Sequence, residues 1–420
     1  MSPQLRTKMV DPRRMAGMFD SGFAALANFL MGIVSVRILD SDLLALYALF
    51  YYGWIIAQLI PAQVVYFPAR LAVNLGTEVV APRVLRDAWR GKWFLVLSCA
   101  ITLLSGLPLA SVTSSTEYLG MAGTAAALTL TSAFNAHIRA SLHLVEAHTQ
   151  ASIVSGVTFG TAAVVTAIGV HVALADGALI ALIPFGITVL ANMVGVIVGV
   201  RKLRAFRAGD YTLAPLRVRL SYLGPELVSQ TGGYVTNLLV AASLGTVALS
   251  QLQAAQVLVG PITVVAGAVA SVYSPSAIRA LAARQSRDLR RISGFQFITC
   301  AVFGALYSVA LLLFGPLLVR LLGSNASPHL SAARAISQTL GSGVDMFGPI
   351  SFAANRQRVW ILASLVSTAV SLLGLSALVT MSSLGTYAVP VAQSAGTVAR
   401  AIVGLHGFSL GPKTPGVSAE

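Results

Sequence analysis

The sequence predicts an all-α membrane protein in which about twelve transmembrane helices form two pseudo-symmetric six-helix bundles. Three observations lead to this fold class. The 420 residues are 56% hydrophobic and only 10% charged, with a mean hydropathy of +0.80. The apolar residues gather in runs that, at roughly 1.5 Å per residue, are long enough to cross a hydrocarbon core of about 30 Å. Finally, features of the first half of the chain return in the second half at a nearly constant offset.

The internal duplication is visible at three places. Asn28, in the first apolar run, is followed 209 residues later by Asn237. The second run ends in a Tyr-Phe-Pro sequence at Tyr66, and its counterpart ends in Tyr-Ser-Pro at Tyr273, 207 residues later. A proline near the end of the third run recurs after 208 residues. A constant offset near half the chain length indicates two copies of one helical bundle.

Each apolar run is predicted to be one helix. Short turns rich in Asp, Ser and Gly separate the runs on one side, and basic connections separate them on the other. Pro61 and Pro261 interrupt the second helix of the first and second half, respectively. The expected helices are residues 15–39, 43–68, 93–112, 119–144, 151–175, 178–200, 222–244, 247–273, 293–322, 328–354, 359–381 and 384–407.

The distribution of basic residues predicts the orientation. With the N-terminus inside, only Arg37, Arg320 and Arg334 of the 28 basic residues fall toward the outer face, as the positive-inside rule requires. We therefore expect a multi-pass protein of the bacterial cytoplasmic membrane with both termini in the cytoplasm. Its expected parts are an N-terminal segment (1–14), an N-lobe (15–200), a basic linker (201–221), a C-lobe (222–407) and a tail (408–420).

Several function classes are disfavoured by the composition. A net charge of +14 is typical of proteins that bind nucleic acid. The sequence has no basic stripe with interleaved aromatic residues, however, so we expect no nucleic-acid partner. Cys99 and Cys300 both lie inside apolar runs, where cysteine packs as a small hydrophobe, and no metal-ligand spacing occurs. No enzyme signature is found. We expect neither catalysis, nor a metal, nor a cofactor, and leave coupling to a proton or sodium gradient open.

Ionisable residues at membrane depth are costly and usually face a cavity or a partner, so each is a candidate for function. Asp20 lies too far into the first helix for capping. It is expected to face a cavity, where it either couples to an ion or holds an arginine. Glu226, at the start of the seventh helix, is explained equally well by the helix dipole. Arg139 has the planar cationic group that binds a diphosphate, but it could equally extend its side chain to the lipid headgroups. A histidine in the position of His137 is more often a hydrogen-bonded interior residue than a functional one.

The tenth helix carries a polar stripe. Arg334, Gln338, Ser342 and Asp345 follow at steps of four, four and three residues and so share one face. This face is expected to look into protein or water, either as an internal ion pair or as a substrate surface. The amides of Asn28, Gln230 and Asn237 are candidates for contacts with sugars, and hydrogen bonding between helices explains them equally well.

The opening sequence DSGFAALANFL, followed by VRIL and LYALFY, resembles the polysaccharide-transport family of the multidrug/oligosaccharidyl-lipid/polysaccharide exporter superfamily. The resemblance is strongest over the first two helices. It implies a V-shaped, MATE-like transporter that moves an undecaprenyl-diphosphate-linked oligosaccharide across the membrane by alternating access. In this chain Asp20, Asn28 and Arg37 occupy the matching stretch of the first helix. The implied partners are a lipid-linked glycan, membrane lipids, and a polysaccharide polymerase or glycosyltransferases.

Two other functions remain open at this stage. A drug or small-solute exporter, of the same superfamily or of the major facilitator type, has a similar helix layout. The stretch between Arg70 and Lys92 lacks the Gly/Asp/Arg-rich loop typical of the major facilitator type. A non-transporting membrane scaffold for polysaccharide synthesis would show charges that face outward or satisfy one another.

Overall fold

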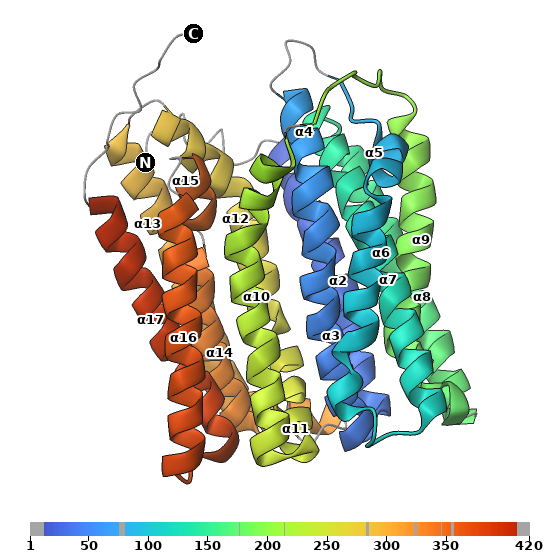
Figure 1. Ribbon diagram of the computed structural model, residues 1–420, viewed down its shortest axis with the longest axis vertical. Coiled ribbons are helices and arrows are strands. Elements are labelled where there is room, and N and C mark those ends of the chain that lie inside the picture. The colour runs from blue at the N-terminus through green and yellow to red at the C-terminus, as the bar shows by residue number, and fades with distance from the viewer. Residues whose placement is uncertain are drawn as a thin grey trace.

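The computed structural model describes residues 12–74, 80–175, 177–213, 215–282, 285–322, 326–345, 347–353 and 357–409. The regular structure of this part of the chain is helical, apart from one isolated β-bridge between Ala81 and Ala208. The long helices stand side by side along the long axis of the molecule (Figure 1). The predicted all-α class is therefore confirmed.

The described residues of the first half of the chain (the N-half) form eight α-helices: α2 (Pro12–Ile38), α3 (Ser41–Pro61), α4 (Phe67–Asn74), α5 (Val84–Arg90), α6 (Lys92–Ser105), α7 (Ser115–Leu144), α8 (His148–Ala175) and α9 (Ile183–Leu203). The second half (the C-half) contains α10 (Leu216–Leu244), α11 (Thr246–Leu258), α12 (Gly260–Ala282), α13 (Ser286–Leu322), α14 (Pro328–Asp345), α15 (Phe347–Ala353), α16 (Gln357–Met381) and α17 (Ala388–Ser409).

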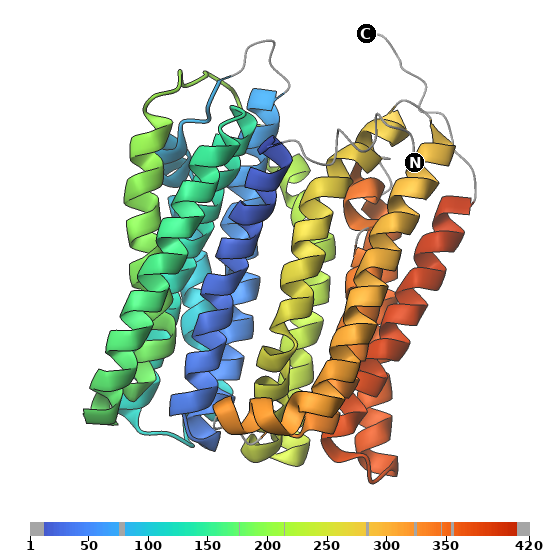
Figure 2. The same ribbon diagram turned by 180° about the vertical axis from the view of Figure 1, so that it is seen from behind.

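The same helix pairs pack in both halves. α2 contacts α8 as α10 contacts α16, and α8 contacts α9 as α16 contacts α17. α6 packs on α7 as α13 packs on α14. The halves lie beside each other in both views (Figure 2) and meet where α2 contacts α12 and α3 contacts α10 and α11. This repeated arrangement matches the two bundles that the sequence offset predicts.

The number of described helices that are apolar enough to span a membrane is smaller than the number of transmembrane helices predicted from the sequence. Eight described helices, or nine with the bent pair α11–α12, are long and apolar enough to cross a membrane, against about twelve expected. The long helices α7, α10 and α14 do not meet this criterion. These are the helices that carry Arg139, Glu226 and Arg334. Their polar side chains lower the mean hydropathy, which is expected of helices that turn one face toward protein or a cavity.

Local signals in the sequence set several helix ends. The side chain of Asp40 accepts hydrogen bonds from the backbone N–H groups of Asp42 and Leu43 and so caps α3. Ser114 and Glu117 form a capping box at the start of α7. Gly245, between α10 and α11, has φ +86°, a conformation that side chains other than glycine rarely adopt. These turns lie at the end of the molecule opposite the basic connections.

The second helix of each half is interrupted near its middle. After Pro61 the chain continues as one π-helical turn, Ala62–Tyr66, before α4 begins. In the C-half, α11 and α12 meet at an angle of 44° around Val259. Proline lacks the N–H group that continues a helix, and π-helical turns are frequent at functional sites. Both interruptions lie where the halves face each other.

We call the end with the basic connections the basic end, and the opposite one the far end. Toward the far end the halves share one apolar core, in which Met31, Tyr47 and Phe50 pack with Leu252 and Val257. At the far end itself, Thr246 donates a hydrogen bond of 2.7 Å to Asp42. The two halves are therefore joined by packing and by a polar contact on this side.

Candidate functional site

A polar cavity of about 210 Å³ lies within the C-half. Its walls come from α10, α11, α14, α16 and α17, with Tyr52 of α3 as the contribution of the N-half. Hydroxyl and amide side chains dominate the lining. We call this the C-half cavity; it is lined by Tyr52, Ser229, Gln230, Gly232, Gly233, Thr236, Gln256, Arg334, Ser337, Gln338, Gly341, Asp345, Ser367, Thr368, Ser371, Gln393, Thr397 and Arg400.

Arg334 is the central charged group of this cavity. Its side chain is buried; Nε donates to Oε1 of Gln256 at 2.9 Å, and Nη1 donates to Oε1 of Gln393. These partners are neutral amides, and no described carboxylate forms an ion pair with the guanidinium. A charge held only by neutral dipoles keeps its electrostatic attraction for an anion. Because a buried charge without a counter-ion is costly, the cavity favours an anionic group beside Arg334.

A second arginine lies toward the basic end of the same cavity. Nη1 of Arg400 donates to Oδ1 of Asp345 at 2.5 Å, and the guanidinium lies 4.2 Å from the ring centroid of Trp360. The carboxylate and the indole together fix Arg400 in place. One aspartate and two arginines give the cavity a formal charge of +1.

Helical geometry brings the residues of α14 into this wall. Arg334, Ser337, Gln338, Gly341 and Asp345 all line the cavity, and their spacing keeps them on one face of the helix. From Arg334 to Asp345 the helix rises by about 16 Å, so the polar wall extends toward the basic end. The stripe predicted from the sequence therefore faces the cavity, with Gly341 in the place expected for Ser342.

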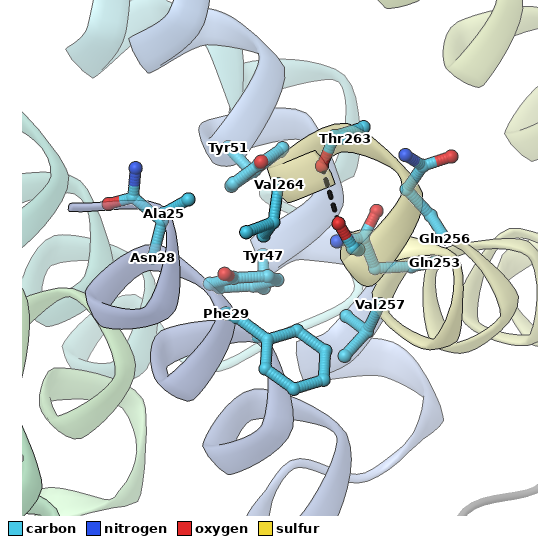
Figure 3. A pocket seen from close by; sticks show the side chains of 12 residues that line it. Ala25, Asn28, Phe29, Tyr47, Tyr51, Gln253, Gln256, Val257, Thr263 and Val264 are labelled. Atoms are coloured by element: carbon cyan, nitrogen blue, oxygen red, sulfur yellow. Dashed lines mark hydrogen bonds between the residues drawn. The ribbon is translucent and has the colours of Figure 1, made fainter. Parts of the chain in front are cut away.

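A smaller cavity of about 170 Å³ lies between the halves, and we call it the interlobe cavity. α2 and α3 form one wall of it, and α11 and α12 form the other; Asn28, Phe29, Tyr47, Tyr51 and Gln253 are among its lining residues (Figure 3). Aromatic rings and amides line this space, and none of its described lining residues is charged. Gln256 lines both cavities, so the two cavities are adjacent and share this side chain in their walls.

Glycines set the close approach of the two halves at the base of the interlobe cavity. A Cβ atom on Gly260 would lie 2.7 Å from Phe29, and one on Gly32 would lie 2.9 Å from Val257. Any larger side chain at these positions would require the Phe29 ring, the Val257 side chain or the helices themselves to shift. The glycines are therefore required by packing at the seam.

Asp20 lies in a dense polar cluster of the N-half. It receives hydrogen bonds from Nε and Nη2 of Arg139, both at 2.8 Å, and from Ser155 at 2.6 Å. Nε2 of His143 is 2.9 Å from Oδ2 of the same carboxylate. The structure thus shows Asp20 holding an arginine, one of the two roles predicted for it. Neither Asp20 nor Arg139 lines either of the two cavities.

His137 belongs to another cluster, near the basic end. Its Nε2 is 3.3 Å from Oδ2 of Asp87, and its ring stacks on Tyr66 with centroids 4.4 Å apart. The hydroxyl of Tyr211, from the segment that joins the two halves, donates to the other oxygen of Asp87. Burial and the negative charge of Asp87 raise the pKa of Tyr211 above its ordinary value. His137 is an interior histidine, but only Nε2 is satisfied, because Nδ1 has no hydrogen-bond partner among the described residues.

The segment between the halves is fastened to the N-half by further contacts. The backbone of Ala81 exchanges hydrogen bonds with Arg207 and Gly209, at 2.9 and 3.0 Å. Arg83 and Arg86 form ion pairs of 3.0 and 3.3 Å with Asp210. We call these contacts, together with the Tyr211–Asp87 hydrogen bond, the linker clasp.

The remaining predicted residues are dispersed. Asn28 lines the interlobe cavity and Gln230 lines the C-half cavity. Arg37 is exposed, near the far end of α2, and Glu226 is half-buried in α10, outside both cavities. Asn237 is buried, and its side-chain nitrogen has no hydrogen-bond partner in the part of the chain that the structure describes.

The sequence reasoning did not single out most of the C-half lining, including the side chains of Tyr52, Gln256, Gln393 and Arg400. A signal existed for two of them. Gln393, Thr397 and Arg400 follow at steps of four and three residues in the last helix, the same pattern that identified α14. In the described part of the chain, no cluster of His, Cys, Asp or Glu has the geometry of a metal site.

Comparisons with known proteins support the architecture. No family model matches the chain, and no curated protein matches its sequence. Solved structures do. A MATE transporter of the MOP superfamily in an inward-facing conformation aligns with TM-score 0.65 and 18% identity over 92% of this chain and 94% of its own. The chain has the MATE fold.

Two further MATE-fold structures are similar to the chain. A MOP-superfamily transporter from Pyrococcus furiosus, described as having a binding pocket of reverse polarity, aligns with TM-score 0.67 and 17% identity over 94% of each chain. An outward-facing multidrug-resistance MATE transporter aligns with TM-score 0.62 and 16% identity over 94% of each chain. The fold of these proteins and the apolar spans support a multi-pass membrane protein.

Proposed function

We propose that the protein is a transporter that moves an anionic, hydroxyl-rich substrate by alternating access, and that this substrate is a lipid-linked oligosaccharide. The observation that carries the proposal is Arg334. A buried guanidinium held by two neutral amides faces a polar cavity with a formal charge of +1. A phosphate or diphosphate group supplies the missing counter-charge, and the planar guanidinium suits its oxygens.

The rest of the cavity lining suits a sugar. Seven serine and threonine hydroxyls and four glutamine amides line the space, all able to donate and accept hydrogen bonds. Apolar drugs make little use of such a surface. The lipid tail of the substrate would stay in the bilayer while the cavity accommodates the charged head.

The arrangement also suits alternating access. Transporters built from internal repeats commonly bind substrate at the interface of the repeats. Here the halves are joined toward the far end, and the second helix of each half is interrupted, in the C-half at Gly260 beside the interlobe cavity. Solved structures of a similar fold, described as inward-facing and outward-facing, show that the fold adopts two such states in those proteins. We propose that this chain alternates in the same way.

A drug exporter is the second candidate function. It is favoured by the interlobe cavity, where Phe29, Tyr47 and Tyr51 offer aromatic surface without charge, and by the fold shared with multidrug transporters. The charge of the C-half cavity disfavours a cationic drug. The neighbour whose binding pocket has reverse polarity illustrates that the fold accommodates pockets of different charge.

The proposal includes the setting of the protein. It places the chain in a bacterial cytoplasmic membrane with the basic end and both termini inside, next to the enzymes that assemble the glycan. Energy would come from a proton or sodium gradient, without a cofactor and without catalysis. Asp345, Glu226 and Asp20 remain the candidate coupling acids, and Asp345 is the one that lines a cavity.

Complementation tests the proposal. A strain lacking its own lipid-linked glycan flippase receives the wild-type chain, Arg334→Gln, or the control Arg37→Gln, which alters an exposed arginine outside both cavities. We expect surface glycan to return with the wild type and the control and to fall at least tenfold with Arg334→Gln at equal membrane expression. Drug susceptibility is measured in parallel. Drug resistance without surface glycan, or full activity of Arg334→Gln, would overturn the proposal.

A further inference from the structure

The corner between α5 and α6, at the basic end, presents tryptophans outward. Trp89 is 69% exposed and Trp93 is 73% exposed, whereas Trp54 and Trp360 are 4% and 1% exposed. Leu85 is also exposed. Large aromatic residues rarely stand free of the protein body unless another surface receives them.

These side chains form one continuous strip. Gly91 separates α5 from α6, but its N–H donates to the carbonyl of Asp87 at 2.9 Å, and its own carbonyl accepts from Leu95 at 3.0 Å. Helical hydrogen bonding therefore continues through the corner. Leu85, Trp89, Trp93 and Val96 are spaced by four, four and three residues and share one outward face.

Basic groups lie on the same corner. Nζ of Lys92 is 4.3 Å from the ring centroid of Trp89 and 5.7 Å from that of Trp93, so the ammonium lies over both rings. Arg90 is exposed beside it. The two nearby arginines of the linker clasp share the single carboxylate of Asp210. The corner as a whole carries an excess of positive charge.

We propose that this corner is a binding site for the headgroup of an anionic phospholipid, with the phosphate at Lys92 and Arg90 and the acyl chains along Trp93 and Val96. Indole rings favour the membrane interface, where one edge is apolar and the other wet. The excess of positive charge selects an anionic lipid over a zwitterionic one. Each basic residue near an anionic surface favours such lipids by about fivefold.

Lipid-dependent fluorescence quenching tests the site directly, because two of the four tryptophans are buried. The full chain is reconstituted in phosphatidylcholine vesicles in which roughly a tenth of the lipid carries brominated chains. The brominated lipid is either phosphatidylglycerol or phosphatidylcholine. Because Arg90 and Lys92 each contribute about fivefold, the expected preference is about 25-fold, and we expect roughly seven times more quenching from the brominated phosphatidylglycerol. The paired change Trp89→Phe and Trp93→Phe is expected to remove most of the quenchable signal.

The charge of the corner is tested with two double variants. Arg90→Gln with Lys92→Gln is expected to abolish the difference between the two brominated lipids. Arg287→Gln with Arg290→Gln, which removes two exposed arginines at the start of α13, is expected to keep it. Equal quenching by both lipids in the wild type overturns the proposal. So does a difference that survives the first double variant, or one that disappears in the second.

Discussion

The cluster around Asp20 permits a quantitative test of whether this acid is structural or couples transport to an ion. Asp20→Ala removes a carboxylate that accepts three hydrogen bonds from Arg139 and Ser155 and lies beside His143. Removing one partner of a buried ion pair costs about 3–5 kcal/mol. Because the Arg139 side chain retains 17% exposure, water relieves part of this cost. We expect a loss of about 3 kcal/mol in unfolding free energy.

A double-mutant cycle separates the pair from its surroundings. Arg139→Ala alone is expected to cost about 3 kcal/mol, since Asp20 then stays buried without its main partner. The combined variant is expected to lose about 2 kcal/mol less than the sum of the single losses. Equilibrium unfolding in mixed micelles of mild detergent and dodecyl sulfate measures all three. Arg37→Ala, an exposed control, is expected to stay within about 0.5 kcal/mol of wild type.

One result would refute this reasoning. If Asp20→Ala unfolds within about 1 kcal/mol of the wild type and yet abolishes transport, the carboxylate does not brace the fold. Asp20 would then be an acid that couples transport to an ion, which is the other role that its position deep in the first helix allows. A loss of stability with transport retained in the surviving folded protein supports the structural role.

Three further changes test other parts of the structure. Gly260→Leu is expected to destabilise the seam and reduce transport, because its Cβ would clash with the ring of Phe29. The control Gly267→Ala has open space around it and is expected to be tolerated. Thermal unfolding and complementation distinguish the two variants. Gln256→Glu is expected to give Arg334 an internal counter-ion, so glycan transport falls while the melting temperature is maintained or rises; a fall in both measures contradicts this. Tyr211→Phe is expected to cost about 1–3 kcal/mol and to speed proteolysis of the linker, since it removes one of the two hydrogen-bond partners of the buried Asp87 carboxylate. Because the pKa of this tyrosine is raised, its neutral, donating form persists as the pH rises through 10, and the wild-type linker should stay protease-resistant there.

Helical spacing explains what sequence reasoning could locate. The polar stripe of α14 is a local property: steps of three and four residues fix one face, and a face bearing Arg334 and Asp345 cannot lie against lipid at low cost. The cavity wall was therefore predictable without tertiary information. The all-helical class and the repeat follow in the same way from the length of the apolar runs and from their offset.

Pairing between distant segments explains what sequence reasoning missed. Asp20 and Arg139 are 119 residues apart, and the sequence around each residue does not indicate which residue it pairs with. Gln256 and Gln393 hold Arg334. The helical spacing of Gln393, Thr397 and Arg400 indicates a polar face but does not indicate Arg334 as its partner. The predicted basic loop between the second and third helices contains the short helix α5, whose buried face depends on contacts with α7 and with the linker.

The linker clasp limits how the two halves move. Because the chain is fastened to the N-half as far as Tyr211, only residues 212–215 lie between the last clasped residue and the start of α10. Four residues reach about 14 Å when fully extended. Three residues into α10, Arg219 donates to the carbonyl of Val64 at 3.0 Å. While the clasp holds, the halves share a short tether at the basic end, which limits how far they can separate there.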